Sequence, residues 1–255
     1  MAPDFCIVMP AFRAADILGA TVARIPVAFY DRGGVLVIID DASPDETGGV
    51  ARSLAADHSA IRVIHHPENR GYGGAQKTGL EEGLRLGCRG FAVVHADGQY
   101  APELVLDLLE PILSGEADLV QGSRFLGGGA RAGGMPLTRY LANRALTAVE
   151  NLAFGTRLAE FHSGYMLYSR TLLETVPFRS LRNNFNFDAE MILLGHLAGF
   201  PCHEVAIPTH YGEETSSLDP IPYGLEVLKM IGRHWLGRYD LLLRENCSDR
   251  KENPA

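Results

Sequence analysis

The sequence predicts a single α/β domain whose mostly parallel central sheet is flanked by helices. Short runs that are apolar on both faces, typical of strands in a covered parallel sheet, alternate with stretches of helical periodicity. The spacing of this alternation is that of strand–helix–strand units, which build doubly wound sheets. A length of 255 residues with 46% hydrophobic residues suits one domain of this class.

The expected strands are short and mostly apolar. They are Phe5–Met9, Val35–Asp40, Ile61–His65, Phe91–His95, Asp118–Gly122, Tyr165–Ser169 and Cys202–Ile207. The expected helices are Ala14–Arg24, Asp45–Ala56, Ala75–Leu86, Pro102–Leu113, Leu137–Phe154, Asp188–Ala198 and Ile221–Leu243. A glycine-rich stretch, Gly127–Gly134, is expected to be a flexible loop. We expect the domain to span residues 1–243 and a polar tail to occupy 244–255. Functional loops should lie at the carboxyl ends of the strands.

Composition excludes several classes of function. The net charge is −8, and no basic block is long enough to indicate a nucleic-acid surface. No apolar window reaches the length of a membrane span, and no signal-peptide pattern is present. The four cysteines lack the spacing of zinc ligands or redox pairs, which favours free thiols in a reducing compartment. We therefore expect a cytoplasmic protein, with peripheral contact at the inner face of the membrane left open.

Carboxylates follow two of the expected strands. Asp40 and Asp41 end one, and His95, Asp97 and Gln99 alternate at the end of another. An extended segment would place the last three side chains on one side. Carboxylate and amide oxygens suit Mg²⁺ or Mn²⁺, and an imidazole nitrogen shifts the preference toward Mn²⁺. The alternative interpretation is structural: Asp97 caps the next helix and His95 packs at the strand end.

The segment 71–78, Gly-Tyr-Gly-Gly-Ala-Gln-Lys-Thr, nearly fits a phosphate-binding loop. It would indicate a P-loop nucleotide hydrolase or kinase. However, Gln76 stands where that pattern has a glycine, and the segment follows the third strand rather than the first. The glycines are better explained by a tight turn before a helix, and the N–H groups at that helix start could still face a phosphate.

Taken in order, the motifs resemble the inverting glycosyltransferase family 2, which has the Rossmann-like GT-A fold. Five segments carry this resemblance: Val8-Met9-Pro10-Ala11-Phe12, Asp40-Asp41-Ala42-Ser43-Pro44-Asp45-Glu46-Thr47, Asn69-Arg70-Gly71 followed by Lys77-Thr78-Gly79, His95-Ala96-Asp97, and Gly122-Ser123-Arg124. The resemblance covers roughly residues 4–210. It extends to the branch of dolichyl-phosphate mannose synthases and polyprenyl-phosphate glycosyltransferases. His95 departs from the family pattern, because it stands where the metal motif begins with aspartate.

The resemblance implies a nucleotide-diphosphate sugar donor, such as a UDP-sugar or GDP-mannose, and a divalent cation, Mn²⁺ or Mg²⁺. The implied donor-binding residues are Pro10, Ala11, Phe12, Asp40, Asp41, Lys77, Asp97, Arg124 and His210. The expected metal ligands are His95, Asp97 and Gln99. The cation neutralises the departing diphosphate, and Arg124 can add a bidentate contact to its oxygens. We therefore expect Arg124 to be a catalytic residue as well as a donor-binding one.

The acceptor decides whether a general base is needed. A hydroxyl acceptor needs one, and Asp188 and Glu190 are the candidates; alternatively, they are acids that favourably open a helix. A phosphate acceptor is already anionic and needs cations, which Arg131, Arg139 and Arg144 can supply. We expect a polyprenyl phosphate acceptor, with a soluble hydroxyl acceptor as the alternative. An alternative function of another class is a nucleotide-binding module without transfer activity. The chain could also form a homo-oligomer. The amphipathic Ile221–Leu243 is expected to pack on the domain or to lie on a membrane.

Overall fold

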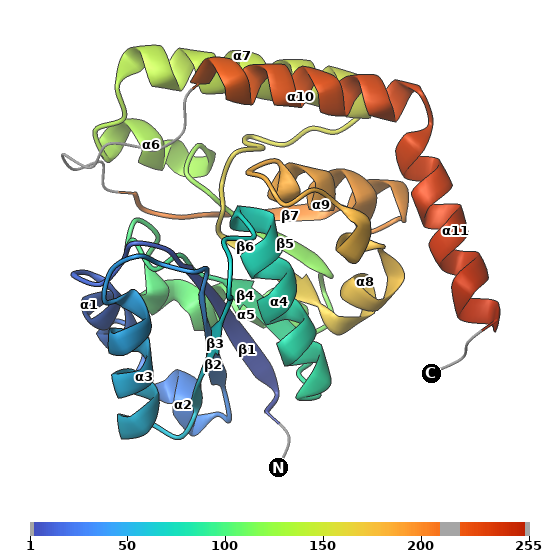
Figure 1. Cartoon of the computed structure of the whole chain (residues 1–255). Coiled ribbons are helices and arrows are strands. Elements are labelled where there is room, and N and C mark those ends of the chain that lie inside the picture. Colours follow the sequence, from blue (N-terminus) through green and yellow to red (C-terminus); the bar gives the residue numbers. More distant parts are fainter. Residues whose placement is uncertain (1–2, 210–219, 253–255) are drawn as a thin grey trace.

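The computed structural model describes residues 3–209 and 220–252. Its centre is a seven-stranded sheet in the order β3-β2-β1-β4-β6-β5-β7 (Figure 1). The strands are β1 (Phe5–Ala11), β2 (Val35–Asp40), β3 (Ile61–His65), β4 (Gly90–Val93), β5 (Leu119–Ser123), β6 (Met166–Ser169) and β7 (Cys202–Ala206). Only β6 runs antiparallel to its neighbours, β4 and β5. The predicted mostly parallel sheet is therefore confirmed.

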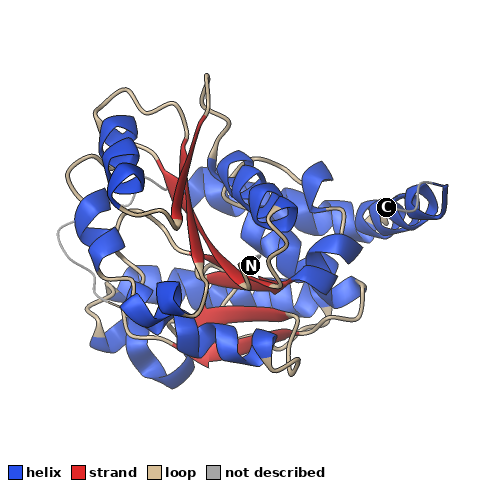
Figure 2. Ribbon diagram, turned by 90° about the horizontal axis from the view of Figure 1, so that it is seen from below, coloured by secondary structure: helices blue, strands red, loops and turns tan. Residues whose placement is uncertain are grey.

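Eleven α-helices surround the sheet in the described part of the chain (Figure 2). They are α1 (Leu18–Ala23), α2 (Val27–Asp31), α3 (Thr47–Asp57), α4 (Tyr72–Arg85), α5 (Val105–Leu113), α6 (Gly129–Ala132), α7 (Leu137–Phe154), α8 (Arg170–Thr175), α9 (Phe187–Leu197), α10 (Pro220–Trp235) and α11 (Arg238–Glu252). Single turns of 3₁₀-helix occur at Pro102–Leu104, Leu126–Gly128 and Phe178–Ser180. None of the described helices is long and apolar enough to cross a bilayer.

The strands are apolar throughout because helices cover both faces of the sheet. In β1, Cys6 and Val8 belong to a core shared with α4, α8, α9 and α10. Their neighbours Phe5, Ile7 and Met9 point to the other face, into a core shared with α1, α2, α3 and α5. Alternate residues of one strand thus enter two different cores. This arrangement explains why the sequence shows continuous apolar runs rather than apolar–polar alternation.

Two expectations about local structure were not met. The loop expected at Gly127–Gly134 contains the short helix α6, which begins after Gly127 and Gly128 turn the backbone at positive φ. The single helix expected over Ile221–Leu243 is broken at Gly237, where φ is +69°. The helix α11 that follows runs across the expected start of the polar tail, and Asn246 donates a hydrogen bond of 2.8 Å to the Thr175 carbonyl of α8.

Glycines let α4 approach the sheet closely. A Cβ atom on Gly79 would lie 2.7 Å from Ile39 Cδ1 and would also overlap Val8, so this helix rests directly on β1 and β2. A Cβ on Gly83 would lie 2.7 Å from the ring of Phe91 in β4. The close approach fixes the height of α4 above the sheet. It therefore also fixes the residues at the start of α4, which face the carboxyl ends of the strands.

Replacing Gly79 with alanine should destabilise the protein by about 1–3 kcal/mol, the usual cost of overpacking a core. The matched control is Gly232→Ala in α10, where an added Cβ meets no atom within 4 Å. That change should be neutral or stabilise by up to about 1 kcal/mol, because alanine loses less backbone entropy than glycine on folding. Urea unfolding of both variants measures the difference, and equal stabilities would contradict the packing role of Gly79.

Candidate functional site

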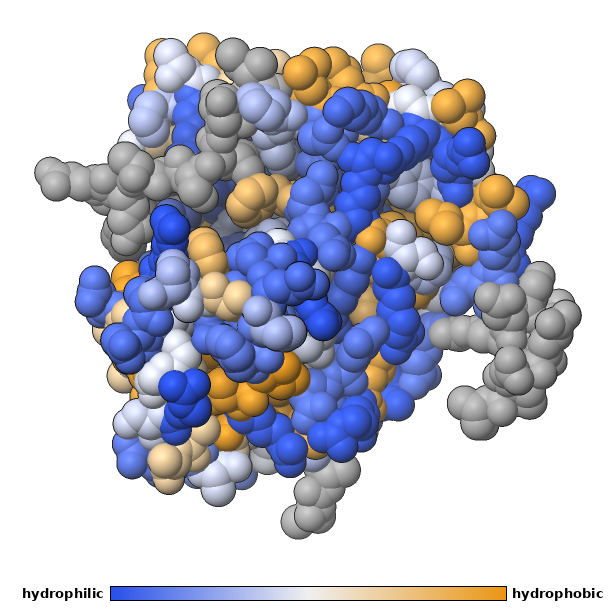
Figure 3. All heavy atoms as spheres, viewed as in Figure 1, coloured by the Kyte–Doolittle hydropathy of each residue, from blue (hydrophilic) through white to orange (hydrophobic). Residues whose placement is uncertain are grey.

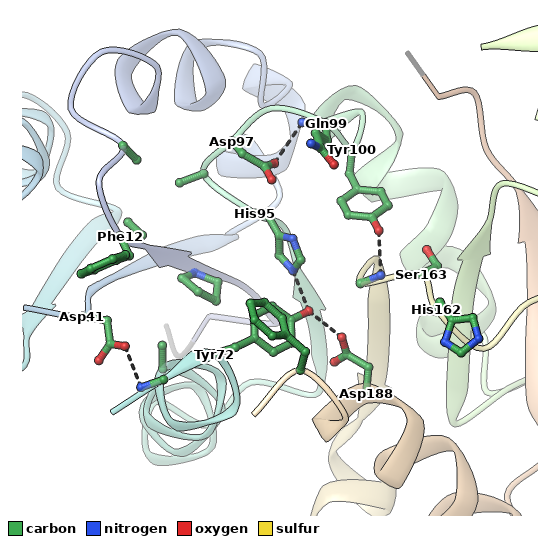
Figure 4. Close-up of a pocket in the computed structure, with 18 of the residues that line it drawn as sticks. Phe12, Asp41, Tyr72, His95, Asp97, Gln99, Tyr100, His162, Ser163 and Asp188 are labelled. Atoms are coloured by element: carbon green, nitrogen blue, oxygen red, sulfur yellow. Dashed lines mark hydrogen bonds between the residues drawn. The ribbon is translucent and has the colours of Figure 1, made fainter. Parts of the chain in front are cut away.

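A cavity of about 750 Å³ opens at the carboxyl ends of β1 and β4. Segments far apart in the sequence line it (Figure 4). They are the end of β1 and the following turn, the start of α4, the loop after β4, the segment 161–164, and single residues of α7, α9 and α10. This is where open α/β sheets bind ligands. The cavity therefore lies at the end of the sheet where functional loops were predicted.

The two aspartates after β2 have different surroundings. Asp41 lines the cavity, and its carboxylate accepts hydrogen bonds from the backbone N–H groups of Arg70 and Gly71, at 2.8 and 2.9 Å. The same carboxylate contacts His66 Nδ1 at 2.6 Å. Asp40 is buried beneath the cavity, where it bonds the backbone N–H of Ser43 and the His65 ring. Asp40 thus builds the turn, and only Asp41 of the pair reaches the cavity wall.

A hydrogen-bonded chain connects three elements at the centre of the cavity. The Tyr72 hydroxyl at the start of α4 donates to Asp188 Oδ2 of α9 at 2.5 Å. The Tyr72 hydroxyl oxygen also lies 2.9 Å from Nε2 of His95, which is in the loop after β4 (Figure 4). Gln76 donates to the other carboxylate oxygen, Asp188 Oδ1, at 3.0 Å. Both oxygens of this carboxylate are therefore bonded to residues of α4.

Burial dominates the electrostatics of this chain. Desolvation raises the pKa of Asp188, although the hydrogen bonds from Tyr72 and Gln76 and the nearby His95 oppose that shift. Desolvation, with the neighbouring Asp188 charge, also raises the pKa of Tyr72 well above its usual value. The chain is closely packed: a Cβ on Gly164 would lie 2.8 Å from the Tyr72 hydroxyl and 2.9 Å from His95 Nε2. Glycine at this position therefore lets the segment 161–164 pass against the chain.

The expected metal ligands His95, Asp97 and Gln99 all line the cavity, but the segment that carries them is bent rather than extended. Strand β4 ends at Val93, and the chain turns at residues 96–98, where Gly98 has a φ of +70°. His95, Asp97 and Gln99 therefore do not share an extended segment, and His95 Nε2 is occupied by Tyr72. Asp97 is exposed at the cavity wall, and its Oδ1 accepts the Gln99 backbone N–H at 3.0 Å. Among described residues, no cluster of three or more His, Cys, Asp or Glu side chains could hold a metal.

Arg124 lines the cavity but is largely buried by an ion pair with Glu160, a residue that sequence reasoning missed. Its Nε lies 2.8 Å from Glu160 Oε1, and its Nη2 donates to the His162 carbonyl at 2.6 Å. Glu160 also accepts the Arg124 backbone N–H at 2.9 Å. The pair fixes this guanidinium at the cavity wall. Any contact with a donor phosphate would have to be made while Arg124 keeps Glu160 as its partner.

The remaining predicted residues divide into those at the cavity and those away from it. Pro10, Ala11, Phe12 and Arg139 line it. Lys77 instead donates to Asn183 Oδ1 at 2.8 Å and to the Leu181 carbonyl. Glu190 bonds Tyr239 and the Arg182 backbone N–H, and Arg131 and Arg144 donate to the carbonyls of Met135 and Ala159. His210 lies outside the described residues.

The wall opposite Asp97 contains a second buried polar group that the sequence did not indicate. His162 Nδ1 lies 2.7 Å from the Tyr223 hydroxyl of α10, and its Nε2 lies 3.1 Å from Glu150 of α7. Glu150 is fully buried, and desolvation raises its pKa. His162 and Tyr223 line the cavity. The histidine therefore links the two outer helices to the cavity.

The P-loop interpretation of residues 71–78 is wrong. The Gly71 N–H is bonded to Asp41, and the Gly73 N–H donates to the Asn183 carbonyl at 2.9 Å. A Cβ on Gly73 would lie 2.6 Å from the Arg182 carbonyl. These glycines therefore let α4 pack against the segment 182–183, and these two N–H groups are bonded within the protein. Tyr72 and Gln76 of this segment instead donate hydrogen bonds to Asp188.

Comparison with known proteins decides the family. The sequence model of the family described as glycosyl transferase family 2 matches residues 6–176, which is more than half of the chain. The chain belongs to this family. A polyprenol monophosphomannose synthase of Mycolicibacterium smegmatis is 29% identical over 203 residues, which cover 79% of this chain and 75% of the relative. An undecaprenyl-phosphate mannosyltransferase of Micrococcus luteus is 29% identical over 185 residues, covering 72% and 74%.

Solved structures support the same fold. Glucosyl-3-phosphoglycerate synthase from Mycobacterium tuberculosis, in complex with Mn²⁺, UDP and glucosyl-3-phosphoglycerate, matches with a TM-score of 0.61 at 20% identity. The match covers 96% of this family 2 chain and 80% of the synthase. The predicted GT-A fold is therefore confirmed. The chain is a glycosyltransferase, so the alternatives of a P-loop hydrolase and of a nucleotide-binding module without transfer do not hold.

Asp188→Asn should change how stability depends on pH. Because the pKa of Asp188 is raised in the folded state, the folded protein binds this proton more tightly than the unfolded chain does. Relative to the variant, the wild type should be most stable below the unfolded pKa of about 4. That advantage should shrink as the pH rises through the raised folded pKa. Urea unfolding of both proteins across this range tests the sign, and a pH-independent difference would contradict it.

Proposed function

We propose that this glycosyltransferase moves a sugar, with inversion, from a nucleotide-diphosphate donor to a polyprenyl phosphate. The observation that carries the proposal is the state of the carboxylates that line the described cavity: Asp41, Asp97 and Asp188. Asp41 and Asp188 each have both oxygens in hydrogen bonds. If Asp97 serves a cation, the other two carboxylates could take a hydroxyl proton only by giving up one of these hydrogen bonds or by relay through it. A phosphate acceptor needs no such base, because it is already anionic at neutral pH.

Two further features support a phosphate acceptor. Arg139 lines the cavity from α7, whereas Arg131 and Arg144 do not. It therefore places a cationic side chain where a phosphate could bind, in a protein whose net charge is −8. The names of the two relatives also mention polyprenol and undecaprenyl phosphate.

A divalent cation fits at Asp97 better than at the set expected from the sequence. Asp97 offers an exposed carboxylate on the cavity wall, and oxygen is the ligand that Mg²⁺ and Mn²⁺ accept readily. Diphosphate oxygens of the donor would supply further ligands, which removes the need for a protein cluster. When bound, the cation would neutralise charge on the leaving diphosphate. His95 could contact this cation only through Nδ1, because its Nε2 contacts the Tyr72 hydroxyl.

In the proposed site, the chain's own residues orient and enclose the donor. Pro10, Ala11 and Phe12 form the wall beneath the nucleoside, and Asp41 holds the turn before α4 in place. Arg124, held by Glu160, presents a fixed positive group toward the leaving phosphates. Tyr72 holds His95 and Asp188 together on the acceptor side. A preorganised site of this kind lowers the cost of reorganisation during transfer.

A hydroxyl acceptor is the second candidate, favoured by the same hydrogen-bonded chain. Asp188 lines the cavity, and the Tyr72 hydroxyl connects it to His95. An acceptor proton could in that case pass to Asp188 through the tyrosine. Asp188 would then be the general base predicted from the sequence, whereas Glu190, which does not line the cavity, would support α9 and α11.

Asp97→Ala should abolish Mn²⁺-dependent nucleotide binding and lower turnover by at least about 100-fold, since it removes the protein ligand of the cation. Calorimetry with UDP and GDP, with and without Mn²⁺, measures binding. Gln99→Ala is the matched control and should keep the metal dependence. The hydrogen bond from residue 99 to Asp97 comes from the backbone N–H, so it remains in this variant. Unchanged metal-dependent binding in Asp97→Ala would refute this role.

Asp188→Asn and Arg139→Glu should separate the two acceptor classes. With a phosphate acceptor, Asp188→Asn should keep turnover within a few-fold, and Arg139→Glu should raise the acceptor KM without changing donor affinity. Arg131→Glu, at a position away from the cavity, is the control and should leave that KM unchanged. Loss of a general base costs about 10²–10⁴ in rate. A loss of that size in Asp188→Asn, with normal kinetics in Arg139→Glu, would assign a hydroxyl acceptor.

A further inference from the structure

Two helices on one side of the molecule carry unusually apolar outer faces. α7 and α10 pack side by side as a layer at the top of Figure 1. α7 buries Thr147, Glu150 and Phe154 and leaves a stripe of apolar side chains exposed. The exposed large apolar residues of the layer are Leu137, Leu141, Val149 and Leu152 of α7, and Leu225, Leu228 and Trp235 of α10, with Leu236 just beyond. Leu152 is 88% exposed and Trp235 is 72% exposed.

We call these residues the apolar face. Apolar atoms gather along the upper edge of the molecule, above α7 and α10, in Figure 3. Single exposed leucines need no explanation, but a stripe repeated along two adjacent helices does. The spacing in α7 is helical, since Leu137, Leu141 and Leu152 project from one side while the buried residues project from the other.

The charged residues within the two helices that carry the apolar face are mostly basic. The only acidic residue within α7 is Glu150, which is fully buried against His162. The only acidic residue within α10 is Glu226, which is paired with Arg182 and Lys229. Exposed cations of this layer include Arg144 and Lys229. In a chain of net charge −8, this layer thus combines exposed apolar side chains with basic ones and offers almost no unpaired acid.

The same two helices reach the cavity. Arg139 of α7 and Tyr223 of α10 both line it, one turn or less from the exposed Leu137, Leu141 and Leu225. A molecule with a phosphate at the cavity and a hydrocarbon chain leaving it would therefore meet the apolar face within the first turns of α7 and α10. The cavity and the apolar face thus both include residues from the first turns of α7 and α10.

We propose that the apolar face docks on a bilayer containing anionic lipids, with the cavity beside the lipid surface. This inference rests on the proposed polyprenyl phosphate acceptor and adds the surface through which the enzyme reaches it. Apolar side chains enter the headgroup boundary, and the neighbouring cations bind anionic headgroups. A second copy of the chain fits less well, because a two-fold interface would bring the same basic residues against each other.

The test compares three proteins with acceptor-free vesicles of phosphatidylcholine, with or without phosphatidylglycerol. Leu141→Glu combined with Leu152→Glu places two charges in the apolar face. The control, Val27→Glu, changes an equally exposed apolar residue (72%) on α2, at the opposite end of the molecule (Figure 1). Wild type and control should sediment with the anionic vesicles. The vesicle partition coefficient of the double variant should be at least about tenfold lower than that of the wild type. Each introduced carboxylate opposes insertion into the headgroup boundary and is repelled by anionic headgroups.

Two additional measurements keep the outcomes separate. Turnover with a short-chain, water-soluble polyprenyl phosphate should be equal in all three proteins, because neither substitution touches the cavity. Wild type that stays in the supernatant while turning over this acceptor would overturn docking and leave the proposed function standing. Vesicle binding without turnover would support docking and refute the proposed acceptor. Light scattering showing a dimer that the double variant dissociates, without vesicle binding, would assign the face to a second copy and overturn the proposal.

Discussion

The hydrogen bond from Tyr72 to Asp188 is the contact on which the arrangement of the site depends. A largely buried carboxylate in a cavity wall is costly unless its oxygens are bonded, and α4 supplies both donors to Asp188 through Tyr72 and Gln76. The same tyrosine reaches His95 in the loop after β4. One side chain therefore couples α4, α9 and the loop that carries Asp97.

That bond can form only because α4 lies close to its neighbours. Gly79 brings the helix onto β1 and β2, Gly73 brings its first turn against the segment 182–183, and Gly164 lets another segment cross the Tyr72–His95 contact. The resemblance of residues 71–78 to a phosphate loop has a physical origin in this packing. Both kinds of segment need glycines where a backbone approaches another group closely. In a P-loop that group is a phosphate, whereas here it is the carbonyl of Arg182 or Asn183.

The sheet could be predicted from the sequence because strands buried on both faces are continuous apolar runs, such as Phe5–Met9 and Val35–Asp40. The site could be predicted only in part. Asp97 was found because it follows a strand, but the turn at residues 96–98 means that His95, Asp97 and Gln99 line the cavity from a bent segment rather than from an extended one. The partners Glu160 of Arg124 and Tyr72 of Asp188 are distant in sequence, and no periodicity marks such pairs. Likewise, the break between α10 and α11 depends on one glycine inside a continuous amphipathic pattern.

The charge distribution gives the proposed docking a direction as well as an affinity. An acidic protein is repelled by an anionic bilayer wherever its acids are exposed, and that repulsion acts over a Debye length of about 8 Å at physiological ionic strength. The layer of α7 and α10 exposes apolar and basic side chains, and its acids Glu150 and Glu226 are buried or paired. Close approach is therefore least opposed through this layer. The same approach brings Arg139 and the adjoining cavity to the lipid surface. In the proposed arrangement, the net charge of −8 thus orients the enzyme rather than opposing its binding.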